Sequence, residues 1–191
     1  MIDLGSTQDE ELLPRANVLN AYVPLSVTAC SMRDSLTAMG SQPSDSEVRA
    51  ALQAYFQVLQ SNPTAEEMQR SVVTDDFETG FAGGYKWQGP HGLREFLAAR
   101  AGFVDEQHDV DEVVEREDLP TGEVRIKTRL TFSLRQPQDD KLFTGTAFHT
   151  WLLRRDNAGR LRVAAQIVDR FSDLNDNAER LFARPNQGLN R

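Results

Sequence analysis

The C-terminal third of the chain contains a carboxylate where an apolar side chain is expected. The stretch RVAAQIVDRFSDL, residues 162–174, has the composition of a strand, in which side chains alternate between two faces. Alternation predicts that Asp169 shares an apolar face and that Gln166 lies on the opposite face. The apolar face comprises Leu161, Val163, Ala165, Ile167 and Phe171. A buried carboxylate has a raised pKa and can take a proton from carbon or oxygen near neutral pH. Asp169 is therefore a candidate acid–base residue; the alternative is a carboxylate that caps a loop or pairs with an arginine.

Two histidines in strand-like stretches could also move protons. Alternation predicts that His149 shares a face with Ala147 and Trp151. His108 lies in QHDVDEV, at the start of another such stretch. A histidine can donate a hydrogen bond to a developing oxyanion or shuttle a proton at neutral pH. The alternative for each is a core histidine whose ring nitrogens are satisfied by neighbouring groups.

Other kinds of site have no support in the sequence. The histidines and acids lack close spacings such as H-x-x-x-H, so we expect no metal. The stretch AGGYKWQG has neither the glycine spacing nor the lysine-serine ending of a nucleotide-binding loop. There is no G-x-S-x-G motif, and Cys30 has no evident histidine partner. We therefore expect no cofactor and no covalent catalysis.

Length and composition limit the class of protein. The chain has 191 residues, of which 39% are hydrophobic and 26% charged, which is typical of one globular domain. Its net charge of −8 disfavours nucleic acid or an anionic membrane as a partner and favours a small organic ligand. The single cysteine excludes an internal disulfide, and no export signal or membrane span is evident. We expect a cytoplasmic protein.

The elements that would position these residues can be read from periodicity and turn residues. Residues 1–44 are weakly patterned and are interpreted as an extension, residues 45–183 as the domain, and 184–191 as a tail. A helix is predicted from Ser44, because Val48, Leu52, Tyr55, Phe56 and Leu59 recur at helical spacing. A second helix starts at Thr64, a hairpin follows in FETGF and YKWQG, and a third helix begins near Pro90.

The rest of the domain is predicted to be four long strands and a short helix. The strands cover roughly 107–117, 122–135, 141–155 and 160–172, separated by the turn-forming sequences DLPTG, QPQDD and RDNAG. Such short connections require an antiparallel meander, because a parallel crossover needs a dozen or more residues. Residues 175–183 are predicted to add the helix.

This order of elements resembles the α+β fold of nuclear-transport-factor-2-like proteins. VRAALQAYFQVL, DDFETGFAGGYKWQGPHGLREFL, QHDVDEVV and FHTWLLRRDNAGRLRVAAQIVDRF resemble SnoaL-like polyketide cyclases, scytalone dehydratases, ketosteroid isomerases and dioxygenase β subunits. The resemblance covers about residues 45–172. It implies a cone-shaped, curved antiparallel sheet closed by three helices, with a blind apolar pocket, and a homodimer.

The resemblance also implies roles for single residues. Asp169 matches the acid–base aspartate on the last strand of the cyclases, and His108 matches a pocket histidine of the dehydratases. His149 falls where isomerases place the protonated acid of their oxyanion site, and Tyr55 where they place a hydrogen-bonding tyrosine. Tyr55 could equally be a core aromatic. Thr79 falls where the isomerases have a carboxylate base, which argues against a ketosteroid isomerase.

The expected function follows from these candidates. Acid–base residues Asp169, His149, His108 and Tyr55 would act on a hydrophobic, oxygenated ligand as a dehydratase, isomerase or cyclase. The expected pocket side chains are Trp87, Trp151, Phe77, Phe81 and Thr79, of which either tryptophan could instead be ordinary packing. Two alternatives stay open: a non-catalytic accessory subunit resembling a dioxygenase β chain, and a ligand-binding protein without turnover.

Overall fold

The computed structural model describes residues 42–182. Its helices are α1 (Asp45–Gln60), α2 (Ala65–Ser71), α3 (Gly89–Arg100) and α4 (Asp176–Phe182), with a short 3₁₀ turn η1 (Pro137–Asp139). The Ser44 and Thr64 hydroxyls each accept a hydrogen bond from the backbone N–H three residues later. The carboxylate of the glutamate at that position accepts one from the backbone N–H of Ser44 or Thr64. These two capping boxes fix the starts of α1 and α2, as the sequence predicts.

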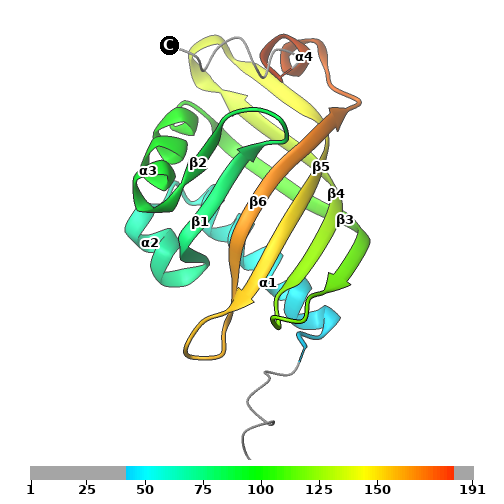
Figure 1. Ribbon diagram of the computed structural model, residues 1–191. Helices are drawn as coiled ribbons and strands as arrows, with labels where there is room; N and C mark the ends of the chain where they lie inside the picture. The colour runs from blue at the N-terminus through cyan, green and yellow to red at the C-terminus, as the bar shows by residue number, and fades with distance from the viewer. Residues whose placement is uncertain (1–41, 183–191) are drawn as a thin grey trace, which may run out of the picture. The chain divides into compact units, whose positions relative to one another are not determined.

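Six strands form one curved sheet (Figure 1). They are β1 (Val73–Phe81), β2 (Lys86–Gln88), β3 (Val104–Asp118), β4 (Val124–Gln136), β5 (Lys141–Arg155) and β6 (Leu161–Ser172). The order across the sheet is β2-β1-β6-β5-β4-β3. The predicted meander is confirmed, because β3, β4, β5 and β6 pair antiparallel in succession.

One strand pair differs from the expected antiparallel sheet. β1 and β2 form the predicted hairpin, but β1 also pairs with β6, and these two strands run parallel. Their relative direction is not set by a short turn, since about eighty residues separate them. The parallel pair joins the hairpin to the meander and makes β6 an interior strand.

The register of β6 overturns the predicted alternation around Asp169. Phe148 pairs with Arg170 and His149 with Val168, so Asp169 is an extra residue without a partner in β5. Ala164 is a second extra residue, between the partners of Leu152 and Leu153. Each such bulge reverses which face the following side chains take. As a result Val163 and Phe171 face inward as predicted, whereas the residues between the bulges exchange faces.

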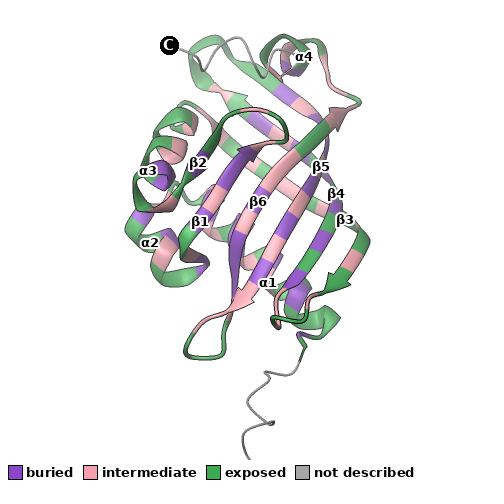
Figure 2. Ribbon diagram, in the orientation of Figure 1, coloured by how far each residue is buried: buried purple, intermediate pink, exposed green. Residues whose placement is uncertain are grey.

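The core lies between α1 and one face of the sheet. Val48, Leu52 and Leu59 of α1 pack against inward side chains of the strands. Inward residues of β5 are buried at every second position, which Figure 2 shows as an alternating pattern along the strand. α1 runs across this face of the sheet, while α3 lies beside β1 and β2 (Figure 1). The predicted short helix after β6 is α4.

The predicted extension falls almost wholly outside the described residues, as does the predicted tail at 184–191. Only residues 42–44 of the extension are described; there Pro43 accepts a hydrogen bond from Arg116 and Gln42 donates one to Leu119. The proposed boundaries at 44 and 183 therefore stay predictions. None of the described helices is long and apolar enough to cross a membrane.

Candidate active site

A cavity of about 540 Å³ lies between α1, the inward face of the sheet and the ends of α3 and α4. Most of its lining is aromatic or aliphatic. The apolar lining includes Phe81, Trp87, Phe103, Phe132, Val168 and Phe171. The polar lining comprises Tyr55, Arg100, His108, Gln136, His149 and Gln166. An apolar cavity with a few convergent polar groups is the usual form of a small-molecule site.

His149 is held in the cavity wall by a chain of side-chain hydrogen bonds. It is 6% exposed, and its Nδ1 lies 3.2 Å from Nε2 of Gln166. The Thr79 hydroxyl donates to Oε1 of Gln166 at 2.6 Å, in a fully buried contact. Because an amide nitrogen only donates, Nδ1 of His149 is the acceptor and Nε2 carries the proton. The chain from Thr79 through Gln166 thus fixes His149 as a neutral hydrogen-bond donor.

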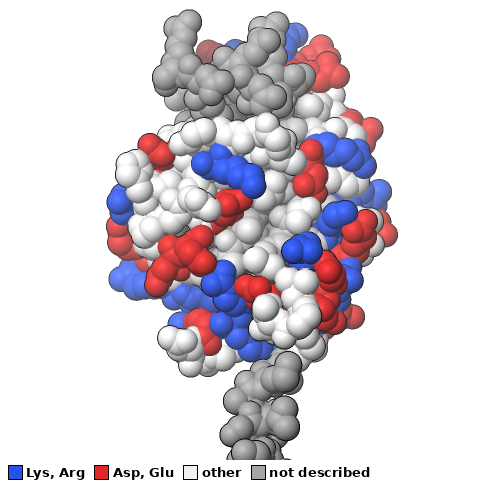
Figure 3. Space-filling view, in the orientation of Figure 1, with Lys and Arg blue, Asp and Glu red and all other residues white. Residues whose placement is uncertain are grey.

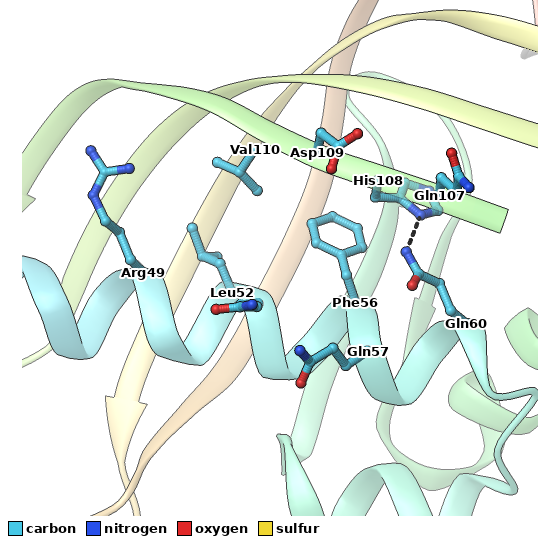
Figure 4. A pocket seen from close by; sticks show the side chains of 10 residues that line it. Arg49, Leu52, Phe56, Gln57, Gln60, Gln107, His108, Asp109 and Val110 are labelled. Carbon is cyan, nitrogen blue, oxygen red and sulfur yellow. Dashed lines mark hydrogen bonds between the residues drawn. The ribbon is translucent and has the colours of Figure 1, made fainter.

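His108 is the second imidazole of the cavity. Its ring stacks on Phe56, with centroids 4.6 Å apart and an interplanar angle of 11°. Its Nδ1 lies 3.5 Å from Nε2 of Gln60, the contact drawn in Figure 4. Figure 4 shows this pair at the end of an open groove between α1 and β3, where Arg49 and Gln57 also lie. Gln53 lines the same groove. Phe56 and His108 line both the groove and the cavity, so they form the wall between them.

Both histidines are neutral at physiological pH. Burial, together with the smaller effect of the charge of Arg100, lowers the pKa of His108 to about 3. Burial likewise lowers the pKa of His149 to about 3, with a smaller contribution from His108. The two rings therefore lie close enough for one charge to oppose the other. Two neutral imidazoles in one cavity can donate and accept protons without carrying a resting charge.

Tyr55 and the ion pair of Arg100 with Glu106 complete the polar part of the site. Tyr55 is fully buried, and burial raises its pKa well above the usual value. The charge of Arg100 lowers that pKa and the charge of Glu106 raises it, each by less than burial does. Nη2 of Arg100 donates to the Glu106 carboxylate, and burial raises the pKa of Glu106 more than the guanidinium lowers it.

Asp169 lies outside the cavity, and its predicted role in the site is wrong. Its side chain is exposed and accepts a hydrogen bond from the Thr150 hydroxyl at 2.7 Å on the outer face of the sheet. The bulge at Asp169 turns it outward and turns Gln166 and Val168 inward, so Gln166 contacts His149 instead.

The predicted pocket side chains divide into two groups. Trp87 and Phe81 line the cavity, as expected. Trp151, Phe77 and Thr79 are buried behind it. Nε1 of Trp151 donates to the Thr128 hydroxyl at 2.9 Å, and its ring packs edge-on against Tyr55. These three residues support the lining residues rather than forming the wall.

Three polar lining residues, Gln136, Gln166 and Arg100, have no counterpart among the predicted site residues. Gln166 faces the cavity only because of the bulges in β6. Arg100 ends α3, and the apolar periodicity of that helix gives no indication that its last side chain turns inward. Neither Gln166 nor Arg100 has a local sequence signal. Within residues 42–182 no cluster of three or more His, Cys, Asp or Glu side chains could hold a metal ion.

Known structures share this fold. No family model matches the sequence, and no curated protein matches it. A candidate scytalone dehydratase from Novosphingobium aromaticivorans superposes with a TM-score of 0.59 at 14% identity, covering 76% of this chain and 91% of that one. Aln2 from a Streptomyces species superposes with a TM-score of 0.54 at 20% identity, covering 67% of this chain and 93% of that one. A ketosteroid isomerase-like protein from Erwinia carotovora atroseptica superposes with a TM-score of 0.51 at 16% identity, covering 65% of this chain and 93% of that one. The described part of this chain therefore has the curved α+β fold that the resemblance to nuclear-transport-factor-2-like proteins implies.

Proposed function

We propose that this protein is a cofactor-independent acid–base enzyme that acts on a hydrophobic, oxygenated small molecule as a dehydratase, isomerase or cyclase. The observation that carries the proposal is His149, which the buried Thr79–Gln166 chain holds as a neutral donor in an apolar cavity. A side chain fixed in one tautomer by two further buried groups is more than a packed core residue needs. His108 in the same cavity supplies a second proton-transfer group.

The chemistry that suits two neutral imidazoles is enolisation of a carbonyl compound. His149 donates from Nε2 to the carbonyl oxygen, while His108 takes a proton from the adjacent carbon through Nε2. For this step the Gln60 amide turns, so that its oxygen accepts from Nδ1–H of His108 and Nε2 has a free lone pair. The C–H bond breaks, its electron pair forms a carbon–carbon double bond, and negative charge collects on the oxygen held by His149. The enolate then takes a proton at another carbon, attacks a second carbonyl, or expels a β-hydroxyl. In the last case the C–O bond breaks and the hydroxyl takes the proton held by His108, so that it leaves as water.

The low pKa values of the two histidines fit this scheme once substrate is present. An imidazolium in the apolar cavity is unstable by itself, because burial disfavours the charged form. A developing enolate places a negative charge beside His108, which favours the imidazolium. Proton transfer is thus favourable only as the enolate forms.

Two alternatives remain in competition with this proposal. The solved structures that share the fold include a ketosteroid isomerase-like protein and a candidate aromatic ring hydroxylase, so the fold alone does not choose a reaction. An accessory subunit would use the same face only for packing. A ligand-binding protein would bind the same class of molecule without turning it over.

Deuterium exchange into the methyl group of 2-acetonaphthone separates the three possibilities. NMR in deuterated buffer measures both the binding of this ketone and the loss of its methyl signal. An enzyme of the proposed type binds the ketone and exchanges its methyl protons faster than buffer does. Binding without faster exchange identifies a ligand-binding protein, and neither binding nor exchange identifies an accessory subunit; either result contradicts the proposal.

We also propose that the protein forms a homodimer through the outer face of the sheet. Phe148, Leu152 and Ile167 point to this face and are half-buried in the single chain. The guanidinium of Arg170 lies over the ring of Phe148, 3.4 Å from its centroid. Figure 3 shows uncharged surface over the centre of this face, with charged side chains on either side. An uncharged centre with a charged rim is typical of a protein interface.

A further inference from the structure

In the ion pair of Arg100 with Glu106, Nη1 of Arg100 has no hydrogen-bond partner among the described residues, and Arg100 lines the cavity. Among residues 42–182, four buried side-chain nitrogen or oxygen atoms have no hydrogen-bond partner. Two of the four, Nη1 of Arg100 and the hydroxyl of Tyr55, belong to residues that line the cavity. A buried donor without a partner destabilises the folded state, and more so when it is charged. A ligand that accepts from these donors would remove that destabilisation.

Glu106 determines what kind of ligand oxygen suits Arg100. Its carboxylate is 4% exposed and accepts from Nη2 of Arg100, whose own side chain is 16% exposed. Glu106 therefore holds the guanidinium in place and cancels its charge. A site that is neutral overall gains little from a second carboxylate but can still donate to a neutral carbonyl oxygen.

We propose that Arg100 binds a second carbonyl oxygen of the ligand through Nη1, while the first carbonyl lies at His149. The substrate class is then a neutral, apolar molecule with at least two carbonyl groups. This deepens the proposed function, on which it rests in placing the reacting carbonyl at His149. Tyr55 lines the same cavity and its hydroxyl also lacks a partner, so it is a second donor for the ligand.

The test compares one carbonyl with two on the same rigid, apolar frame. The probes are 2-acetonaphthone, with one acetyl group, and 2,6- and 2,7-diacetylnaphthalene, with two at different spacings. NMR titration gives the dissociation constant of each. We expect at least one diacetyl isomer to bind about tenfold more tightly than the monoacetyl probe, as for a hydrogen bond to a charged donor. Equal affinities of all three probes would overturn the proposal.

Variants at Arg100 show whether that gain belongs to the guanidinium. Arg100→Met should abolish the gain from the second carbonyl, so that the three probes bind this variant with equal affinity. Arg100→Lys keeps a charge for Glu106 but has a single nitrogen, so it should preserve the fold and also lose the gain. A gain that persists in both variants, or equal losses for both kinds of probe, would contradict a role for Arg100 in binding.

A further variant separates this inference from the proposed function. His149→Gln should weaken all three probes alike and keep the gain from the second carbonyl, because only the first carbonyl lies at His149. The binding measurement needs no turnover. If the protein exchanges the methyl protons of 2-acetonaphthone but binds the diacetyl probes no more tightly, the enzyme proposal stands and the role of Arg100 fails. If it binds a diacetyl probe more tightly but does not exchange the methyl protons, the role of Arg100 stands and the enzyme proposal fails.

Discussion

Nδ1 of His149 lies 3.2 Å from Nε2 of Gln166, across two neighbouring strands of the sheet. The Thr79 hydroxyl donates a hydrogen bond to the oxygen of the same amide, so the Gln166 amide contacts the imidazole through its nitrogen. This relationship decides that His149 presents a proton to the cavity rather than a lone pair.

The tautomer of His149 should follow the side chain at position 166. In the wild-type protein, ring nitrogen shifts in ¹⁵N NMR should show a proton on Nε2 and none on Nδ1. In Gln166→Glu, the carboxylate can still accept from Thr79 but must accept from the imidazole as well. His149 should then carry its proton on Nδ1 and titrate at a higher pH than in the wild type.

Gln166→Leu is the matched control for that measurement, because it keeps the size of the side chain and offers no polar atom. It should leave His149 without a fixed tautomer. Unchanged ring shifts in both variants would mean that Gln166 does not position His149.

Acid should destabilise the folded protein through its two buried histidines. Their pKa values are about 3 in the folded state against 6.5 for the ordinary residue, so the unfolded chain binds more protons as the pH falls below 6.5. Each histidine then lowers the free energy of unfolding by about 1.4 kcal/mol per pH unit within this window. Urea denaturation at several values between pH 7.5 and 5 measures the effect.

The comparison for this prediction is His149→Gln, whose side chain can still accept from Gln166. Glu106 has a raised pKa and contributes with the opposite sign in part of the same window, but it does so equally in both proteins. The variant should therefore lose less stability on acidification than the wild type. Identical pH dependence would show that the pKa of His149 is the same in the folded and the unfolded chain, which contradicts the burial of a neutral ring.

Replacing Asp169 by asparagine should have little effect. The side chain is exposed and its hydrogen bond from Thr150 lies on the outer face, where asparagine can accept it equally well. We expect the free energy of unfolding to change by no more than about 0.5 kcal/mol, as at other exposed positions. Denaturation together with ligand titration checks this, and weaker binding of 2-acetonaphthone would place Asp169 back in the site.

The homodimer should depend on the apolar centre of the outer face. Ile167→Glu places a charge among Phe148 and Leu152, so it should convert a dimer into a monomer without unfolding the chain. Light scattering coupled to gel filtration measures the mass of each form. Glu115→Gln, at the exposed edge of the same sheet where Glu115 pairs with Lys127, serves as the control and should stay dimeric. A wild-type monomer would rule out this interface.

The sequence predicts the framework of this protein more reliably than its site. Helix starts at Ser44 and Thr64 depend on local capping, and the meander follows from turns only a few residues long. These signals need no knowledge of distant residues. The predicted helices and strands are accordingly confirmed to within a few residues.

The site depends on non-local pairing, which explains the errors at Asp169 and Gln166. The bulges in β6 arise from its pairing with β5, and nothing within residues 161–172 marks where they fall. Two reversals of alternation leave Val163 and Phe171 inward, so the ends of the strand fit the simple pattern while its centre does not. The inward placement of His149 and His108 is predicted correctly. β5 pairs with β4 without a shift around His149, and His108 lies opposite Phe132 in a paired stretch of β3.

The most direct test of the central claim is the rate of methyl deuterium exchange in 2-acetonaphthone, compared among three variants. His149→Gln and His108→Gln should each slow the protein-catalysed rate by at least about tenfold, since general acid–base groups contribute about 10²–10⁴ to a rate. Asp169→Asn should match the wild type. Equal rates in the wild type and both histidine variants, or a loss confined to Asp169→Asn, would contradict the assignment of the chemistry to His149 and His108.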